Sequence, residues 1–363
     1  MNARPRDVVG RLRAVWLVLL LVIAGTACGL ETPSGPVLSA RAIEAAAVNS
    51  HSSGGQALII RQWGRTVHES YADSFGPAHR HRVFSITKSL AAMACFAAAK
   101  DGWLSLDEHV ADTITEWKSH PVKSTITVRM LLDQTAGIAA GFPALYAPKL
   151  KDKAAAAIRL PIVFAPGTQF DYGPSFFEVL ETLLSRKLKS RQMSARQWII
   201  ASVLTPAGAT VGADWRTDRS GREYLSSGAM MTARDLVAVG EVILARGKVG
   251  LRTVFPSRYL VEASQGSQAN PMYGLSFWSN RNASGPSARE VSVEEILGRE
   301  FARGFWQAAC LSTAAPDDLL AMLGSGGVRV YIVPSRGLVV VRLGNGTSFN
   351  DSTFLARLFS AAR

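Results

Sequence analysis

The segment from Ser85 to Ala99 constrains the fold most, because it is apolar over nearly its whole length. It contains neither glycine nor proline, and Lys88 is its only charged residue. Such a composition favours a helix, and the Asp101-Gly102 pair that follows is a turn signal. We therefore expect a buried helix that opens near Ser85 and runs through Ala99.

Two polar residues at the start of this helix form a Ser-x-x-Lys spacing. Residues three apart on a helix lie on one face, so the Lys88 amine can reach the Ser85 hydroxyl. A serine becomes a nucleophile when a neighbouring base takes its proton, and a lysine can be that base only while its amine is neutral. Burial against Leu90 and Met93 would disfavour the ammonium form, as would the positive end of the helix. The alternative is a surface serine beside a lysine whose ammonium reaches solvent.

The remaining pattern predicts an α/β (α+β) fold with an antiparallel sheet flanked by helices. One hairpin is expected around Gly64-Arg65 and another around Ser335-Arg336-Gly337, with helices before the first and after the second at residues 40–48 and 354–362. Between the hairpins, helices are expected at residues 127–133, 151–160, 175–187, 195–204 and 233–246. We expect residues 28–55 to form a linker and N-terminal helix, residues 56–110 and 260–363 a discontinuous α/β domain, and residues 111–259 a helical domain inserted in it.

The first residues have the pattern of a secretory signal. Four arginines precede the apolar run of residues 14–24, and Gly25-Thr26-Ala27-Cys28 follows it. The run is too short for a comfortable membrane span, so we expect residues 1–27 to be removed and the protein to be exported to the periplasm or cell envelope. Cys28 has the position of the acylated cysteine of a bacterial lipoprotein, although Gly25 is unusual three residues before it. Lipidation with membrane anchoring and plain cleavage after Ala27 both remain open.

The other cysteines and the net charge exclude several classes of site. We expect Cys95, in the apolar helix, and Cys310, in a strand, to be buried and unbonded. The three cysteines and six histidines show no metal-ligand spacing, so we predict no metal and no cofactor. The formal charge of +12 is scattered and falls to +9 without residues 1–27, which hold four arginines and one aspartate. No basic tract interleaved with aromatic residues accompanies it, so nucleic-acid binding is not expected.

A turn at residues 165–173 brings a phenol to the start of the next helix. Pro174 is suited to the first turn of that helix, so Tyr172 lies directly before it. A phenol held near the lysine can relay a proton between a nucleophile and its leaving group. The alternative is a packed aromatic ring with its hydroxyl in water.

A glycine-rich bend, Gly324-Ser325-Gly326-Gly327, enters an edge-like strand at residues 328–333. Acyl transfer needs two backbone donors that point at the developing oxyanion, and glycine lets a substrate approach the main chain. We expect the N–H of Ser85 to be one donor, and Gly324 or Ser325 to supply the other. A bulge or tight turn packed against a helix is the alternative.

Six segments occur in an order that carries a family resemblance: residues 84–89, 102–108, 126–137, 166–172 and 227–236, and the final Gly-Gly hairpin. The chain resembles the serine β-lactamase and penicillin-binding-protein superfamily over residues 45–360, in its class C branch with esterases and 6-aminohexanoate-oligomer hydrolases. This resemblance implies a β-lactamase/transpeptidase-like fold. It also implies that Ser85 is the acylated nucleophile, Lys88 its base and Tyr172 the proton relay.

The chain departs from the family pattern at two places. Tyr172-Gly173-Pro174 replaces Tyr-x-Asn, and Ala321-Met322-Leu323 replaces the Lys-Thr-Gly of β-lactamases, whose lysine and threonine would bind a substrate carboxylate. We therefore expect an exported serine hydrolase that acts on a small ester or amide. A β-lactamase or D-alanyl-D-alanine carboxypeptidase is one alternative, and a catalytically silent envelope binding protein is another.

Overall fold

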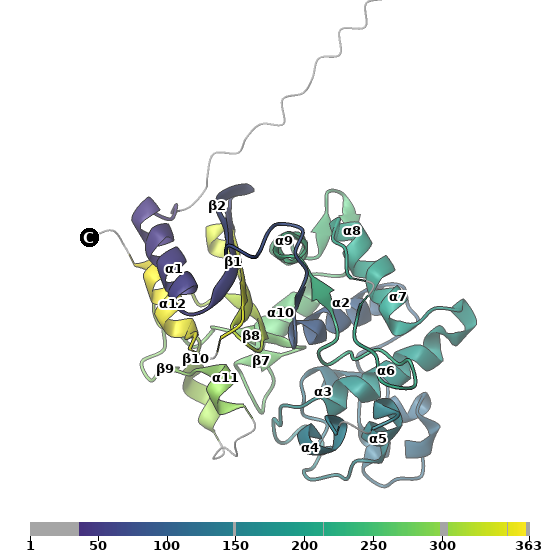
Figure 1. The fold of residues 1–363 in the computed structure, drawn as a ribbon. Coiled ribbons are helices and arrows are strands. Elements are labelled where there is room, and N and C mark those ends of the chain that lie inside the picture. The colour runs from purple at the N-terminus through teal and green to yellow at the C-terminus, as the bar shows by residue number, and fades with distance from the viewer. Residues whose placement is uncertain (1–35, 148–149, 213, 298–303, 347, 361–363) are drawn as a thin grey trace, which may run out of the picture. The chain divides into compact units, whose positions relative to one another are not determined.

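A seven-stranded sheet forms the centre of the computed structural model, which describes residues 36–360 except 148–149, 213, 298–303 and 347. Its neighbouring strands all pair antiparallel. In spatial order the strands are β2 (Arg65–Tyr71), β1 (Gly55–Gln62), β13 (Leu338–Gly344), β12 (Val328–Val333), β11 (Leu320–Gly324), β8 (Phe277–Ser279) and β7 (Tyr273–Gly274). The sheet therefore combines strands from both ends of the chain, and both predicted hairpins are confirmed (Figure 1).

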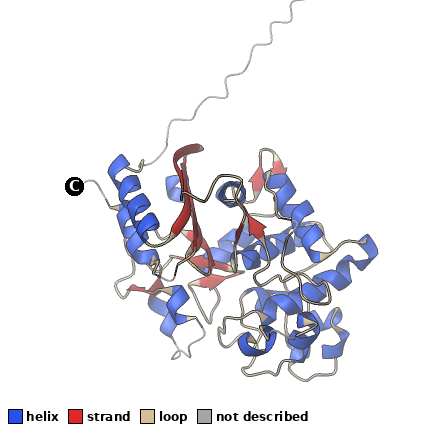
Figure 2. Cartoon of the chain, in the orientation of Figure 1, coloured by secondary structure: helices blue, strands red, loops and turns tan. Residues whose placement is uncertain are grey.

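Helices cover both faces of this sheet (Figure 2). Strand residues alternate between two apolar clusters, as the period of two in a strand requires. Leu58 and Ile60 face α1 (Ala40–Ser52) and α12 (Asp351–Phe359), whereas Ile59 faces α2 (Ile86–Lys100) and α9 (Ala233–Leu244). The predicted apolar helix is thus confirmed as α2, and residues Ile86 to Ala98 are all buried.

The segment between α2 and α9 is mainly helical, as the sequence predicts. Its α-helices are α3 (Val128–Leu132), α4 (Phe142–Leu145), α5 (Lys153–Arg159), α6 (Ser175–Leu188), α7 (Ala195–Ile199) and α8 (Thr205–Ala207). Helices α10 (Arg258–Gln265) and α11 (Val293–Ile296) follow α9, and the short strand pairs are β3 (His81–Arg82) with β4 (Met230–Met231), β5 (Lys248–Val249) with β6 (Arg252–Thr253), and β9 (Arg289–Glu290) with β10 (Ala309–Cys310). The division into two domains stays a prediction, and α9 packs on strands β1, β12 and β13 of the sheet.

One strand lies elsewhere than expected. The sequence predicts residues 328–333 as an edge-like strand, but β12 lies inside the sheet, between β13 and β11. The reason is that Leu320–Gly324 also forms a strand, β11, which pairs with β12 across the glycine-rich bend. The prediction of an edge-like strand was therefore wrong.

Several other predictions concern single residues or the ends of the chain. Cys95 and Cys310 are both buried and unbonded, as expected. The segment of residues 1–27 and Cys28 lie outside the described residues. Within the described part of the chain, no helix is long and apolar enough to cross a membrane.

Candidate active site

The Ser-x-x-Lys pair lies at the start of α2. Ser85 directly precedes the helix, and its hydroxyl makes no capping hydrogen bond. One turn later, the Lys88 Nζ atom lies 3.1 Å from the Ser85 Oγ atom, which is within hydrogen-bond distance. The sequence-predicted contact between amine and hydroxyl is therefore present.

Hydrogen bonds with Ala229 hold the turn that carries Ser85. Phe84 adopts a left-handed backbone with φ of 48°, which is costly for a residue with a side chain. Two hydrogen bonds hold this turn: the Val83 N–H donates to the Ala229 carbonyl at 3.0 Å, and the Ala229 N–H donates to the Thr87 hydroxyl at 3.1 Å. The Ser227-Gly228-Ala229 segment therefore holds the serine in place.

Burial changes the protonation of Lys88. Its side chain is 3% exposed, and its amine donates a hydrogen bond to the Ser226 carbonyl at 2.8 Å. Burial lowers the pKa of Lys88 to about 7, against the opposing effect of the Glu178 carboxylate, while the Lys153 charge lowers it further. A large fraction of the amine is therefore neutral near pH 7 and able to accept a proton.

Tyr172 reaches the same point from the loop before α6. Its side chain is 8% exposed, and the Lys88 Nζ atom lies 4.9 Å from its ring centroid. Burial raises the pKa of Tyr172 well above its usual value, and the neighbouring Ser85 hydroxyl offsets only part of that rise. Tyr172 therefore stays a neutral phenol. The three predicted catalytic residues, Ser85, Lys88 and Tyr172, lie together at the start of α2.

A cleft of about 330 Å³ opens over these groups. Gly324 and Ser325 line it together with Ser85, Lys88 and Tyr172. A Cβ atom on Gly324 would lie 2.4 Å from the Val83 carbonyl oxygen, so only glycine lets β11 come this close to the serine turn. Among the described residues, the backbone N–H of Ser85 donates no hydrogen bond and is available to a ligand.

Two side chains hold the bend of residues 324–327. Arg329, which is 1% exposed, donates from Nη1 to the Gly324 carbonyl at 2.6 Å and pairs with Asp351 at 2.7 Å. Glu294 accepts hydrogen bonds from the N–H groups of Gly326 and Gly327, at 2.6 and 3.2 Å. The bend is thus fixed by a buried ion-pair network, and removal of one partner would leave a buried charge unpaired.

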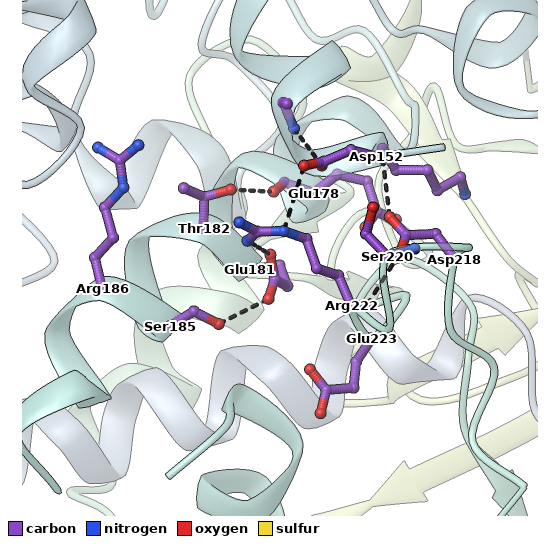
Figure 3. Close-up of polar contacts among 12 residues, drawn as sticks. Asp152, Glu178, Glu181, Thr182, Ser185, Arg186, Asp218, Ser220, Arg222 and Glu223 are labelled. Atoms are coloured by element: carbon purple, nitrogen blue, oxygen red, sulfur yellow. Dashed lines mark hydrogen bonds and ion pairs between the residues drawn. The ribbon is translucent and has the colours of Figure 1, made fainter. Parts of the chain in front are cut away.

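A second charged layer lies behind Lys88, on α5 and α6. The Ser226 hydroxyl, whose backbone carbonyl holds Lys88, donates to the Glu178 carboxylate at 2.5 Å. Burial raises the pKa of Glu178 and lowers that of Lys153, and the opposite charges of the two groups reduce both shifts. Farther along α6, Glu181 pairs with Arg222 at 3.0 Å (Figure 3).

The sequence analysis missed Glu178, Ser226, Glu294 and Arg329. Arg329 had a detectable signal, because an arginine within the apolar strand Val328–Val333 is a buried charge that requires a partner. Glu178 had a weaker sequence signal, since it lies among buried apolar residues of α6. Their partners are more than twenty positions away in sequence, so local patterns do not identify them. No group of three or more His, Cys, Asp or Glu residues arranged to hold a metal occurs in the described ranges.

Gly324→Ala is expected to lower kcat/KM for ester hydrolysis by about 100-fold, since the new methyl group forces β11 away from Ser85 and displaces a backbone donor. The measurement is steady-state kinetics on a nitrophenyl ester with the folded variant. Gly76→Ala is the matched control, because a Cβ atom there meets nothing within 4 Å. Wild-type kcat/KM in Gly324→Ala would contradict a role for this bend near the reacting group.

Comparison with known proteins places this geometry in a family. The family model described as Beta-lactamase matches residues 40–362. A search of curated proteins found no match. Three similar solved structures share the fold at low sequence identity.

The first is a penicillin-binding-protein homologue from Caulobacter crescentus, 16% identical, covering 89% of this chain and 97% of its own, with a TM-score of 0.63. A family VIII carboxylesterase is 17% identical over 90% of this chain and 98% of its own, with a TM-score of 0.62. A protein of Bacillus anthracis provisionally named a 6-aminohexanoate-dimer hydrolase is 18% identical over 83% of this chain and 76% of its own, with a TM-score of 0.61. The chain belongs to the beta-lactamase family and is a serine hydrolase.

Proposed function

We propose that the protein is an exported serine hydrolase that cleaves a small ester or amide through an acyl-Ser85 intermediate. The observation that carries this proposal is the 3.1 Å contact between the Ser85 hydroxyl and the Lys88 amine, whose pKa burial lowers to about 7. Such an amine is a competent base at neutral pH, whereas an ordinary exposed lysine is not.

In the proposed reaction, the neutral Lys88 amine takes the Ser85 proton as Oγ attacks the carbonyl carbon of the substrate. The carbonyl oxygen becomes an oxyanion, stabilised by the N–H of Ser85 and a backbone donor from Gly324 or Ser325. When the tetrahedral intermediate collapses, the bond to the leaving group breaks. The proton passes from Lys88 through the Tyr172 hydroxyl to the departing oxygen or nitrogen. Water then attacks the acyl group and regenerates Ser85.

The chemistry of β11 supports esters and linear amides as substrates more than β-lactams. In place of Lys-Thr-Gly, the strand carries Ala321, Met322 and Leu323, all of them buried. Leu323 presents an apolar side chain to the cleft, where the family pattern has groups that bind a carboxylate. The similar structures include a carboxylesterase and a penicillin-binding-protein homologue, and the substitutions in β11 favour the activity of the first.

We expect a fluorophosphonate probe to label the signal-free protein once, at Ser85. The phosphorus atom is attacked by an activated serine, and fluoride leaves, so intact mass rises by one adduct and peptide mapping locates it. The same preparation is then screened against short esters, linear amides, a penicillin and a chromogenic cephalosporin. Hydrolysis of an ester or linear amide together with the Ser85 adduct is the expected result.

Other outcomes select the alternatives. A stable β-lactam adduct with rapid cephalosporin hydrolysis would favour a β-lactamase or carboxypeptidase. Failure of the probe to label Ser85 would contradict acyl transfer and favour a silent envelope binding protein.

The proposed location depends on the sequence of residues 1–28 alone. Its basic start, short apolar run and small-residue ending support export to the periplasm or cell envelope. Cys28 stays a candidate for lipidation, with plain cleavage after Ala27 as the alternative.

A further inference from the structure

The lining of the cleft combines apolar side chains with a cation. Five of its residues belong to one apolar cluster or pack against it: Phe142, Trp278, Val293, Leu297 and Leu323. Arg82, on β3 and three residues before Ser85, also lines the cleft. A ligand that fills the cleft therefore meets both an apolar surface and a cation.

The Arg82 guanidinium has no hydrogen bond and no ion pair with any residue in the described part of the chain. It lies 4.7 Å above the Phe84 ring, and its Nε atom is buried. A buried donor without a partner costs free energy, which a bound acceptor would recover.

A second arginine reinforces the positive charge. The guanidinium of Arg216 lies 4.6 Å from the Tyr224 ring centroid and likewise forms no ion pair within the ranges described. Burial and then the Arg216 charge lower the pKa of Arg82. The two like charges repel each other, and a bound anion would reduce that repulsion.

The other charged groups that line the cleft are already engaged. Glu294 accepts hydrogen bonds from Gly326 and Gly327 and pairs with Arg329 at 3.1 Å. Arg329 is held by Asp351 as well, and Lys88 contacts Ser85. Of the charged side chains that line the cleft in the described part of the chain, Arg82 is therefore the one that is free to bind a ligand.

We propose that Arg82 is the subsite for a free carboxylate on the substrate, so that the enzyme acts on esters or amides that carry a carboxylate beside an apolar group. This inference rests on the proposed function, because it assigns the substrate class of the same cleft. A planar guanidinium recognises a carboxylate through paired charge-assisted hydrogen bonds. In this proposal the group that binds the anion is Arg82 on β3, the strand that precedes Ser85. It is not on β11, which is apolar in this chain.

Matched ester pairs test the subsite. On the acyl side, 4-nitrophenyl hydrogen glutarate is compared with its methyl ester; on the leaving-group side, 4-carboxyphenyl butyrate is compared with 4-methoxycarbonylphenyl butyrate. The rate measured with Ser85→Ala protein is subtracted from each rate, because the glutarate carboxylate can promote hydrolysis of the ester bond in its own molecule. We expect the carboxylate member of one pair to have a kcat/KM about tenfold higher, and this ratio to fall as salt rises.

The variants are Arg82→Gln and, as a matched control, Arg252→Gln, which removes an exposed charge on the β5–β6 hairpin outside the cleft. Arg82→Gln is expected to bring the ratio close to one, and Arg252→Gln to leave it unchanged. Calorimetry on Ser85→Ala protein, with and without Arg82→Gln, measures ester binding without turnover. About tenfold weaker binding of the carboxylate ester in the Arg82→Gln background is expected.

The outcomes separate the subsite from the reaction. Equal kcat/KM within both pairs, or a ratio that survives Arg82→Gln, overturns the subsite even when the esters are hydrolysed through Ser85. If neither an ester nor a linear amide is hydrolysed, the proposed function fails. The binding measurement then still decides the subsite: Arg82-dependent binding of the carboxylate ester supports it, and equal binding with and without Arg82 overturns it.

Discussion

Ser85→Ala is expected to lower kcat/KM for a nitrophenyl ester by about 10⁴-fold, because the variant lacks the atom that forms the acyl bond. The side chain is small, and its hydroxyl makes no capping hydrogen bond to α2, so the fold should be kept. Residual hydrolysis would come from the oxyanion donors and from binding alone. Steady-state kinetics gives the loss, and circular dichroism checks the fold.

Ser89→Ala is the matched control for this experiment. Ser89 lies one turn after Ser85 on α2, and its hydroxyl donates to the Ser276 carbonyl at 2.6 Å, outside the lining of the cleft. Its loss should destabilise the protein by about 1 kcal/mol and leave ester turnover near that of the wild type. Ester turnover by Ser85→Ala at the wild-type rate would remove Ser85 from the reaction and with it the acyl-enzyme proposal.

Much of the architecture could be predicted because local patterns determine it. The hairpin around Gly64-Arg65 and the apolar helix α2 depend on turn residues and on composition, both of which are local. The position of β12 could not be predicted in this way. Its location inside the sheet depends on β11, a five-residue apolar strand that carries no alternation of polar and apolar residues to reveal it.

The residues of the candidate site also divide into those that the sequence predicts and those that it does not. Ser85 and Lys88 are one helical turn apart, so their contact follows from the spacing. The role of Tyr172 was predicted from the order of the family segments. The groups that support them act across long sequence distances. Ser226 bridges Lys88 and Glu178, and Arg329 joins the bend at Gly324 to Asp351. Such pairings arise from tertiary packing, which a single sequence does not contain.

Lys88→Met is expected to lower kcat/KM by about 10³-fold and to remove the acid limb of the pH profile. Methionine has a similar shape and suits the buried site, but it cannot accept the Ser85 proton. In the wild type, the pKa of Lys88 is about 7, so the amine is protonated and inactive below that pH and neutral above it. The wild-type rate should therefore rise by about tenfold from pH 6 to pH 8 and then level off.

Glu178→Gln identifies the group that titrates. The Glu178 carboxylate raises the pKa of Lys88, so its neutralisation should move the acid limb to lower pH, while the amide still accepts the Ser226 hydrogen bond. Kinetics from pH 5 to 9 on a neutral ester measures both variants. Because burial also raises the pKa of Glu178 to about 7, loss of the acid limb in Glu178→Gln would assign the titration to Glu178. An acid limb that persists in Lys88→Met, or that moves to higher pH in Glu178→Gln, would likewise assign it to another group and leave Ser85 without its base.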